Sequence, residues 1–305
     1  MKPTSSGSFI LRAFVSSWFA SFSLCAAETV VSPDGAVEAA FELRDGVPVY
    51  GLSYKGTGVL AASALGINLK DPYRGGFEVA DTARATVNTE WKPVWGERAS
   101  IPERCNTLTV TLKEKDPRGQ RLIIEMRAYN EGLALRYRLP FAPDTAWRID
   151  SEATEFRFGT DSAAFAIKNT EDTFPQDPIP LAELPKSCMA PFTVRLPDGR
   201  YAAVLEAFVV SYPRCKIEKR ELGAVGIALS GKAEGRGAFT TPWRVVLVGD
   251  NEARLVEHET LVPTLNPPCA IADTSWIKPG LTVSDHYNCM LKMRDLKKVI
   301  DVAHT

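Results

Sequence analysis

The stretch LIIEMRAYNEGLALRYRL (residues 122–139) decides the fold. Apolar and polar residues alternate from Leu122 to Ala128 and again from Ala134 to Leu139. This is the period-two pattern of strands that bury one face. Asn130-Glu131-Gly132 stands between the two runs, and asparagine and glycine accept the positive φ angles of tight turns at little cost. The stretch therefore predicts a β-hairpin.

The same pattern recurs along most of the chain. Short alternating runs are separated by turn signals such as Pro33-Asp34-Gly35, Gly75-Gly76 and Pro197-Asp198-Gly199. Many short strands with little helical pattern indicate a β-sandwich. We therefore predict an all-β fold, a large sandwich domain over residues 28–272. Further strands are expected at Val37–Leu43, Leu108–Leu112, Tyr201–Ala207 and Trp243–Val248.

The stretch from Ile167 to Pro191 interrupts the strand pattern. Its prolines cannot donate ladder hydrogen bonds, so the stretch cannot be a central strand. A loop this long in a compact domain is usually functional or disordered. The prolines are Pro175, Pro178, Pro180, Pro185 and Pro191.

Residues 1–27 have the features of a secretory signal peptide. Lys2 and Arg12 give a positive start, an apolar run follows from Ala13 to Leu24, and Ala26-Ala27 offers small residues for cleavage. The run is shorter than the roughly 20 residues of a membrane span, which favours cleavage over a retained anchor. We therefore expect an exported protein, periplasmic or extracellular, with no membrane span after cleavage.

The charge balance excludes one class of partner. The chain carries 36 basic and 37 acidic residues. Loss of Lys2 and Arg12 on cleavage would leave a net charge of about −3, whereas a nucleic-acid-binding domain needs a concentrated basic face. We expect no nucleic-acid partner.

The cysteines show no metal-binding pattern. Five would remain after cleavage, and their separations do not match the closely spaced pairs of zinc sites. We predict small buried apolar residues, with one disulfide as the alternative that spacing leaves open. The five are Cys105, Cys188, Cys215, Cys269 and Cys289.

The last part of the chain, residues 273–305, differs from the sandwich. Leu296, Val299, Ile300 and Ala303 have helical spacing, which predicts one short amphipathic C-terminal helix. Such a helix is marginal on its own. Its apolar stripe is expected to pack against the sandwich or a partner, or to fray.

Six segments, spread from Ser32 to Gly280, carry a similarity to a known family. They are Ser32-Pro33-Asp34-Gly35, Trp91-Lys92-Pro93-Val94-Trp95-Gly96-Glu97, Arg127-Ala128-Tyr129-Asn130-Glu131-Gly132, Leu205-Glu206-Ala207, Thr240-Thr241-Pro242-Trp243-Arg244 and Asp273-Thr274-Ser275-Trp276-Ile277-Lys278-Pro279-Gly280. In this order they resemble the N-terminal part of glycoside hydrolase family 97, and the similarity runs with gaps from about Thr29 to Gly280. The resemblance implies a galactose mutarotase-like super-sandwich in front of a (β/α)₈ barrel that hydrolyses α-glucosides or α-galactosides.

The sequence given has 25 residues after Gly280, whereas a barrel needs about 250. We therefore expect a domain without the catalytic half, and residues 273–305 as a linker with a remnant of the barrel start. In the family the two catalytic carboxylates lie in the barrel, so no catalytic residue is assigned to this chain.

The resemblance also implies a calcium ion beside the sugar, most of whose ligands belong to the barrel. One ligand comes from a sandwich loop with the pattern glutamate, aromatic, any residue, aromatic. Glu171-Asp172-Thr173-Phe174 is the nearest match, although Asp172 replaces the first aromatic. Glu171 is therefore the candidate calcium ligand, and an ordinary solvated loop charge is the alternative. Calcium takes six to eight oxygen ligands, so Glu171 would need the barrel to bind it.

Three other glutamates are candidate site residues. Glu152 and Glu155 are three apart, so on a strand they point to opposite faces, and we expect surface charges. Glu206 lies in an apolar strand, where a lone carboxylate is costly. Arg244 or Arg136 is its expected partner, in a structural role.

Tryptophans are the candidate carbohydrate-binding residues, since aromatic faces suit the apolar face of a pyranose. Trp91 and Trp95 stand beside a turn, where stacking on sugar and ordinary packing are about equally favoured. Large aromatics more often fill a core or an interface, so packing is expected for Trp243 and Trp276.

These observations lead to one functional hypothesis and two alternatives. The first is the carbohydrate-binding or supporting domain of a family 97 glycosidase, inactive alone. The second is a free-standing carbohydrate-binding module. The third is a degenerate fragment without function.

Overall fold

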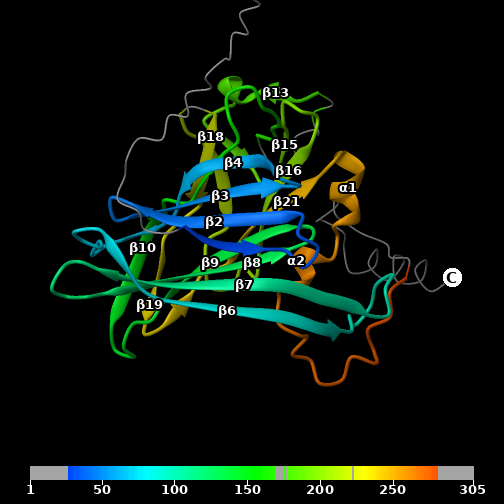
Figure 1. Ribbon diagram of the computed structural model, residues 1–305. Coiled ribbons are helices and arrows are strands. Elements are labelled where there is room, and N and C mark those ends of the chain that lie inside the picture. Colours follow the sequence, from blue (N-terminus) through cyan, green and yellow to red (C-terminus); the bar gives the residue numbers. More distant parts are fainter. Residues whose placement is uncertain (1–26, 169–174, 176, 222, 281–305) are drawn as a thin grey trace, which may run out of the picture.

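The computed structural model describes residues 27–168, 175, 177–221 and 223–280. It is built from antiparallel sheets, and its two large sheets pack face to face (Figure 1). The predicted helix with Leu296 and Ala303 lies outside the described residues. No helix in the described part of the chain is long and apolar enough to cross a bilayer.

The first sheet has eight strands and begins at the N-terminal end of the described chain. Its first four strands follow one another as hairpins, and the last four come from later parts of the chain. In spatial order the strands are β1 (Glu28–Val31), β2 (Val37–Arg44), β3 (Val47–Tyr54), β4 (Thr57–Ala64), β11 (Glu155–Arg157), β18 (Ala224–Leu229), β17 (Cys215–Lys219) and β14 (Ser187–Met189).

The second sheet has ten strands, and β21 lies in its middle. The last strand on the path forms a long hairpin with its neighbour. The order is β13 (Ile179–Pro180), β12 (Ala163–Phe165), β15 (Phe192–Arg195), β16 (Tyr201–Ala207), β21 (Trp243–Gly249), β9 (Gly132–Leu139), β8 (Arg121–Tyr129), β7 (Ile101–Glu114) and β6 (Phe77–Trp91), with β20 (Phe239–Thr240) paired to β9.

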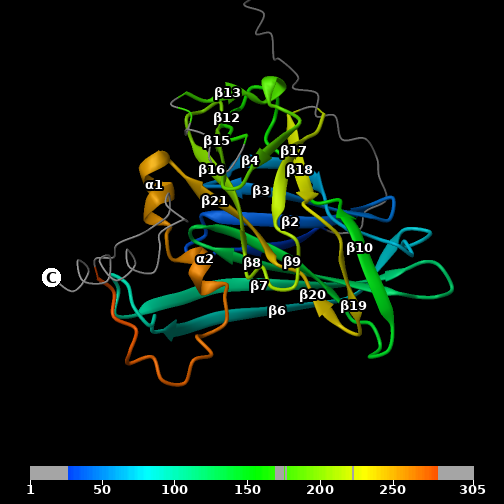
Figure 2. The ribbon, with the colours of Figure 1, turned by 180° about the vertical axis from the view of Figure 1, so that it is seen from behind.

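A third sheet of three strands and three short helical segments complete the described fold. Figures 1 and 2 both place α2 beside the end of the β6–β7 hairpin. The strands are β19 (Ala233–Arg236), β10 (Ala146–Glu152) and β5 (Ile67–Leu69); the helices are α1 (Glu252–Glu257), α2 (Leu261–Thr264) and the 3₁₀ helix η1 (Leu181–Glu183).

The predicted hairpin is present as β8 and β9, and its register shows why the turn needs glycine. Tyr129 pairs with Gly132 across the turn. A Cβ atom on Gly132 would lie 2.0 Å from the carbonyl oxygen of Val246 on the neighbouring strand β21. Only a residue without a side chain allows β9 and β21 to approach this closely.

The main core lies between the two large sheets, where the inward faces of the alternating strands meet. Leu122, Ile124 and Met126 of β8 are fully buried there. Strand β21 is buried along its whole length because its outer face is covered too. There Trp243, Val245 and Leu247 join a second apolar cluster with Leu261 of α2 and with Leu265.

The all-β sandwich is as predicted, and so is the exclusion of a central strand from residues 167–191. Among the described residues of that stretch the only strands are β13 and β14, and both lie at sheet edges. Three of the four described cysteines, Cys105, Cys188 and Cys215, are buried as expected, whereas Cys269 is exposed. No two of these four are bonded to each other.

Candidate functional site

A pocket of about 750 Å³ lies at the tip of the β6–β7 hairpin. One wall is the hairpin itself, from Trp91 at the end of β6 to Glu103 near the start of β7. The opposite wall is residues 259–269, which include α2. The two walls are far apart in the sequence and meet because α2 packs on the outer face of the ten-stranded sheet.

The pocket brings together the two tryptophans that were the candidate carbohydrate-binding residues. Trp91 is half-buried, and its indole Nε1 donates a hydrogen bond to the Thr264 hydroxyl at 3.1 Å. Trp95 is 64% exposed and lines the same pocket. One indole is thus held against α2 while the other is open to solvent.

Charged groups line the same pocket. Arg98 of the hairpin tip contacts Glu259 across the opening, with 3.1 Å between Nε and Oε1. Glu103 lies deeper and is held from the sheet side, where Arg127 Nη1 donates to Oε1 at 2.9 Å. The pocket therefore offers aromatic faces, a fixed carboxylate and further charges to a ligand.

The candidate calcium ligand Glu171 lies outside the described residues. Among residues 27–168, 175, 177–221 and 223–280, no group of three His, Cys, Asp or Glu side chains could hold a metal ion. A calcium ion needs at least six oxygen ligands. The described side chains therefore do not form such a site, and the calcium assignment to Glu171 stays a prediction.

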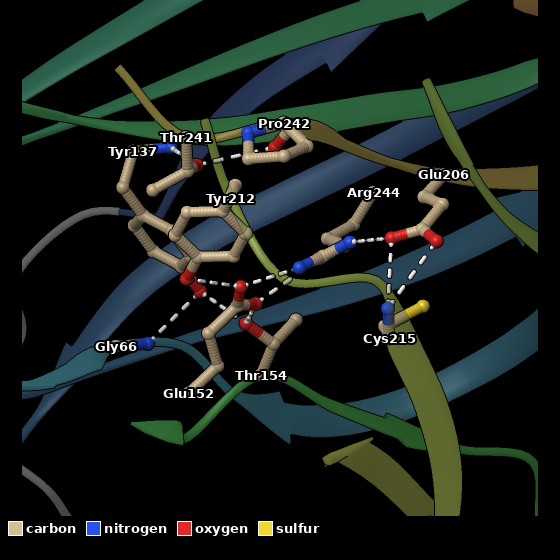
Figure 3. Close-up of polar contacts among 10 residues, drawn as sticks. All are labelled: Gly66, Tyr137, Glu152, Thr154, Glu206, Tyr212, Cys215, Thr241, Pro242 and Arg244. Atoms are coloured by element: carbon tan, nitrogen blue, oxygen red, sulfur yellow. Dashed lines mark hydrogen bonds and ion pairs between the residues drawn. The ribbon is translucent and has the colours of Figure 1, made fainter. Parts of the chain in front are cut away.

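A second polar constellation is buried between the sheets and centres on Arg244 of β21 (Figure 3). Arg244 donates from Nε to Glu152 Oε2 at 3.1 Å and from Nη2 to Glu152 Oε1 at 2.5 Å. Its Nη1 donates to Glu206 Oε2 at 2.7 Å. The guanidinium thus bridges β10 and β16, and charge-assisted bonds of this two-pronged kind are strong and geometrically specific.

Neighbouring groups donate further hydrogen bonds to the carboxylates of Glu152 and Glu206. The Tyr212 hydroxyl donates to Glu152 Oε1 at 2.8 Å, and the Thr154 hydroxyl donates to Oε2 at 3.1 Å. On the other side, the backbone N–H of Cys215 donates to both oxygens of Glu206. Every oxygen of the two carboxylates therefore has a donor, and the arrangement is that of a structural ion cluster.

The cluster shifts the pKa values of its members. Burial alone would lower the pKa of Arg244, but the carboxylates of Glu152 and Glu206 outweigh it and raise that pKa. Burial raises the pKa of Tyr212, and the negative charge of Glu152 adds to the effect. Burial also raises the pKa of the Cys215 thiol, to about 12. At neutral pH the cysteine is therefore protonated and a poor nucleophile.

The expectation of surface charges at Glu152 and Glu155 was wrong for Glu152. Glu152 is 2% exposed and paired with Arg244, whereas Glu155 is partly exposed and paired with Arg157. The register of β10 shifts between Ile149 and Ser151. This irregularity turns Glu152 inward. The predicted pairing of Glu206 with Arg244 is confirmed.

The outer face of the ten-stranded sheet holds the third notable group. Trp243 is 1% exposed, and two guanidinium groups lie over its ring, Arg136 at 4.1 Å and Arg127 at 4.9 Å from the ring centre. Glu125 pairs with Arg136 and fixes it. The packing role expected for Trp243 is confirmed. Trp276 is 67% exposed, so it does not pack in the core of the described residues, and a packing role at an interface stays a prediction.

Sequence reasoning missed two parts of the pocket. Glu103 lies on a strand that was predicted only from Leu108 onward, and α2 has four residues, too few for a periodic pattern. A usable signal was the Pro263 and Pro267-Pro268 series after a polar stretch, since proline favours the first turn and the boundaries of helices.

The fold and the pocket together define a large antiparallel β-sandwich domain with a tryptophan-lined pocket at one end. Residues 30–268 match the family described as Glycosyl-hydrolase 97 N-terminal, and the chain belongs to that family. The resemblance found in the sequence is therefore confirmed.

Individual relatives agree with this membership. The chain is 29% identical over 239 residues to a probable retaining alpha-galactosidase of Streptomyces bingchenggensis. This alignment covers 75% of this chain and 36% of the relative. It is 22% identical over 302 residues to a retaining alpha-galactosidase of Bacteroides thetaiotaomicron, and this alignment covers 85% of this chain and 44% of the relative. The chain thus spans less than half the length of either relative.

Solved structures give the same result. A glycoside hydrolase family 97 enzyme from Pseudoalteromonas sp. strain K8, in complex with panose, superposes with a TM-score of 0.77 at 30% identity. The match covers 83% of this chain and 40% of that enzyme. A beta-arabinopyranosidase superposes with a TM-score of 0.63 at 21% identity, which supports the sandwich fold alone.

Proposed function

We propose that this chain is the carbohydrate-binding and supporting domain of a family 97 glycoside hydrolase, and that the pocket of Trp91 and Trp95 is its carbohydrate site. The observation that carries the proposal is that both tryptophans line one pocket of about 750 Å³. Ligand pockets of about 300–1,000 Å³ that combine aromatic walls with a few polar groups are typical binding sites.

The relatives give the class of ligand. Two are named as alpha-galactosidases and one is in complex with panose, so α-linked glucosides and galactosides are the ligands to test. Cleavage of a glycosidic bond uses two facing carboxylic groups. The buried Glu152 and the partly buried Glu206 do not face each other across a free cleft, because both are ion-paired with Arg244. We therefore assign hydrolysis to a catalytic domain joined to or associated with this one.

Calorimetry with the purified chain tests the binding role. Panose, maltotriose and an α-galactoside such as melibiose should each be titrated. We expect at least one of these sugars to bind with a dissociation constant in the millimolar range. Binding should be lost in Trp91→Ala and weakened in Trp95→Ala. Trp276→Ala is the matched control, because Trp276 is as exposed as Trp95 (67% against 64%) and does not line the pocket. Absence of heat with all three ligands would contradict the proposal.

A second candidate function is that of a free-standing carbohydrate-binding module. The 64% exposure of Trp95 favours it, since an open aromatic platform can bind a sugar without another domain. The two functions differ in how the polypeptide occurs in the cell. An antibody against the sandwich should detect a product of sandwich size if the module is free-standing, and a larger enzyme if it is not.

Export and calcium remain parts of the proposal. We propose that residues 1–27 are removed on export to the periplasm or the outside of the cell, which mass spectrometry of the mature N-terminus near Glu28 tests. We also propose that Glu171 contributes to calcium binding only in the presence of the catalytic domain. Addition of EDTA should then leave the melting temperature of this chain unchanged.

A further inference from the structure

The β6–β7 register places a carboxylate beside the inner tryptophan of the pocket. Trp91 pairs with Ile101 and Thr89 pairs with Glu103. Directly opposed residues of an antiparallel pair share a face, and so do residues two apart on one strand. Trp91 and Glu103 are therefore diagonal neighbours on the same face of the hairpin, and both line the pocket.

One oxygen of the Glu103 carboxylate is hydrogen-bonded to side chains of β8, and the other oxygen can accept a further hydrogen bond. Oε1 accepts hydrogen bonds from Arg127 Nη1 at 2.9 Å and from the Tyr129 hydroxyl at 3.2 Å. Oε2 accepts only a long contact of 3.4 Å from the Thr89 hydroxyl, as far as the described residues go. A carboxylate oxygen can accept two hydrogen bonds, so Oε2 can take a ligand hydroxyl.

The two tryptophans differ in how firmly they are placed. The hydrogen bond from Trp91 to Thr264 fixes the inner indole. Trp95 lies four residues farther along the hairpin tip and is 64% exposed. The pocket therefore has an inner aromatic platform beside a fixed acceptor and an outer platform at its rim.

We infer that the pocket has two subsites for a neutral oligosaccharide of at least two rings. The inner ring stacks on Trp91 and donates a hydroxyl to Glu103 Oε2, and the next ring stacks on Trp95. A ligand with its own carboxylate would bring a second negative charge beside Glu103 and bind less well. This inference rests on the proposed carbohydrate function and adds the length, charge and orientation of the ligand.

Titration of the purified chain with glucose, maltose and glucuronate tests the two subsites. Maltose should bind about tenfold more tightly than glucose, because a second stacking contact contributes on that scale. Trp95→Ala should remove this difference and leave glucose binding unchanged. Equal affinities of glucose and maltose for the wild-type chain would overturn the two-subsite arrangement.

Glu103→Gln tests the orienting carboxylate. It should weaken the binding of both neutral sugars by about tenfold, since hydrogen bonds to a charged acceptor are stronger than those to a neutral one. The substitution should also bring the affinities for glucose and glucuronate closer together. A purely structural role of Glu103 would leave the ratio of these two affinities unchanged. Unaltered binding of all three sugars would refute the role of Glu103.

The controls separate this inference from the proposed function. Glu90→Gln is the matched substitution, because Glu90 neighbours Trp91 but is exposed and does not line the pocket; it should change nothing. The glutamine at position 103 can still accept from Arg127, and thermal unfolding checks that the variant is folded. If no sugar binds the wild-type chain, the proposed function itself fails. If sugars bind without dependence on length or on Glu103, only the inference fails.

Discussion

Arg244 and Glu152 are 92 residues apart in the sequence, yet two nitrogens of Arg244 donate hydrogen bonds to both oxygens of Glu152. Their side chains are 1% and 0% exposed. The pair joins β21 in the middle of the ten-stranded sheet to β10 of the three-stranded sheet. It therefore links parts of the sandwich that form from distant segments.

Removal of one partner of this pair should destabilise the protein strongly. Arg244→Met should lower the free energy of unfolding by about 3–5 kcal/mol, because it leaves the buried carboxylate of Glu152 without a counterion. Glu152→Gln should lower it by less, because Arg244 keeps its ion pair with Glu206. The double variant should cost less than the sum. Urea unfolding measures these values. Asp250→Asn, which breaks the exposed pair with Lys55, is the control and should have little effect. Additive losses in the double variant would contradict the coupling.

Gly132 should not tolerate a side chain. Gly132→Ala places a Cβ atom 2.0 Å from the Val246 carbonyl oxygen, so the β9–β21 pairing must distort, at a cost of at least about 2 kcal/mol. Gly35→Ala is the comparison, because Gly35 also has positive φ but no atom within 4 Å of the added Cβ. It should cost about 1 kcal/mol. Equal losses in the two variants by urea unfolding would show that the close approach does not matter.

The contacts of Arg136 and Arg127 with the Trp243 ring should contribute measurably to stability. Arg136→Ala removes the closer guanidinium, and a loss of about 1–2 kcal/mol is expected from the partly desolvated cation–π contact and lost packing. The fluorescence of Trp243 should also change. Arg138→Ala keeps both arginines over the Trp243 ring and removes only the neighbouring bond to Glu125. It should therefore change the free energy of unfolding and the fluorescence less than Arg136→Ala does. A larger effect of Arg138→Ala would argue against a role of the Arg136–Trp243 contact.

His258 should make the sandwich sensitive to mild acid. Burial lowers the pKa of His258 from its usual value near 6.5, so the folded state prefers the neutral imidazole. The unfolded chain binds the proton more readily, and the free energy of unfolding should therefore fall as the pH drops below about 6.5. Above that pH the neutral His258 makes its full contribution to the free energy of unfolding. His258→Gln should flatten this part of the curve relative to wild type. Parallel curves for both proteins would rule out His258 as the cause.

The strands that bury one face were the most predictable part of the fold. In β8 the buried residues Leu122, Ile124 and Met126 alternate with partly exposed ones, so the sequence carries the period of the sheet. Strand β6 escaped prediction for the opposite reason. It is an edge strand whose residues are mostly exposed on both faces. Its apolar alternation from Phe77 to Trp91 is weak, because alanines and polar residues stand at several of the alternate positions where buried strands carry large apolar residues.

The site was predictable only where one segment carries it. Trp91 and Trp95 stand close together in the sequence, and they do line one pocket. The wall formed by α2 depends on how the chain returns to the hairpin, which no local pattern records. Glu152 was misjudged for a similar reason, because the irregularity between Ile149 and Ser151 changes which face a later residue occupies.

The bond between Trp91 and Thr264 joins residues 173 positions apart, so the pocket exists only after almost the whole described chain has closed. A molecule that binds there distinguishes the finished fold from every open form of the chain. By mass action it must then raise the stability of the entire sandwich, by about 2.7 kcal/mol at a hundred times its dissociation constant. Melting curves recorded against a sugar library can therefore find the natural ligand without any assumption about its identity.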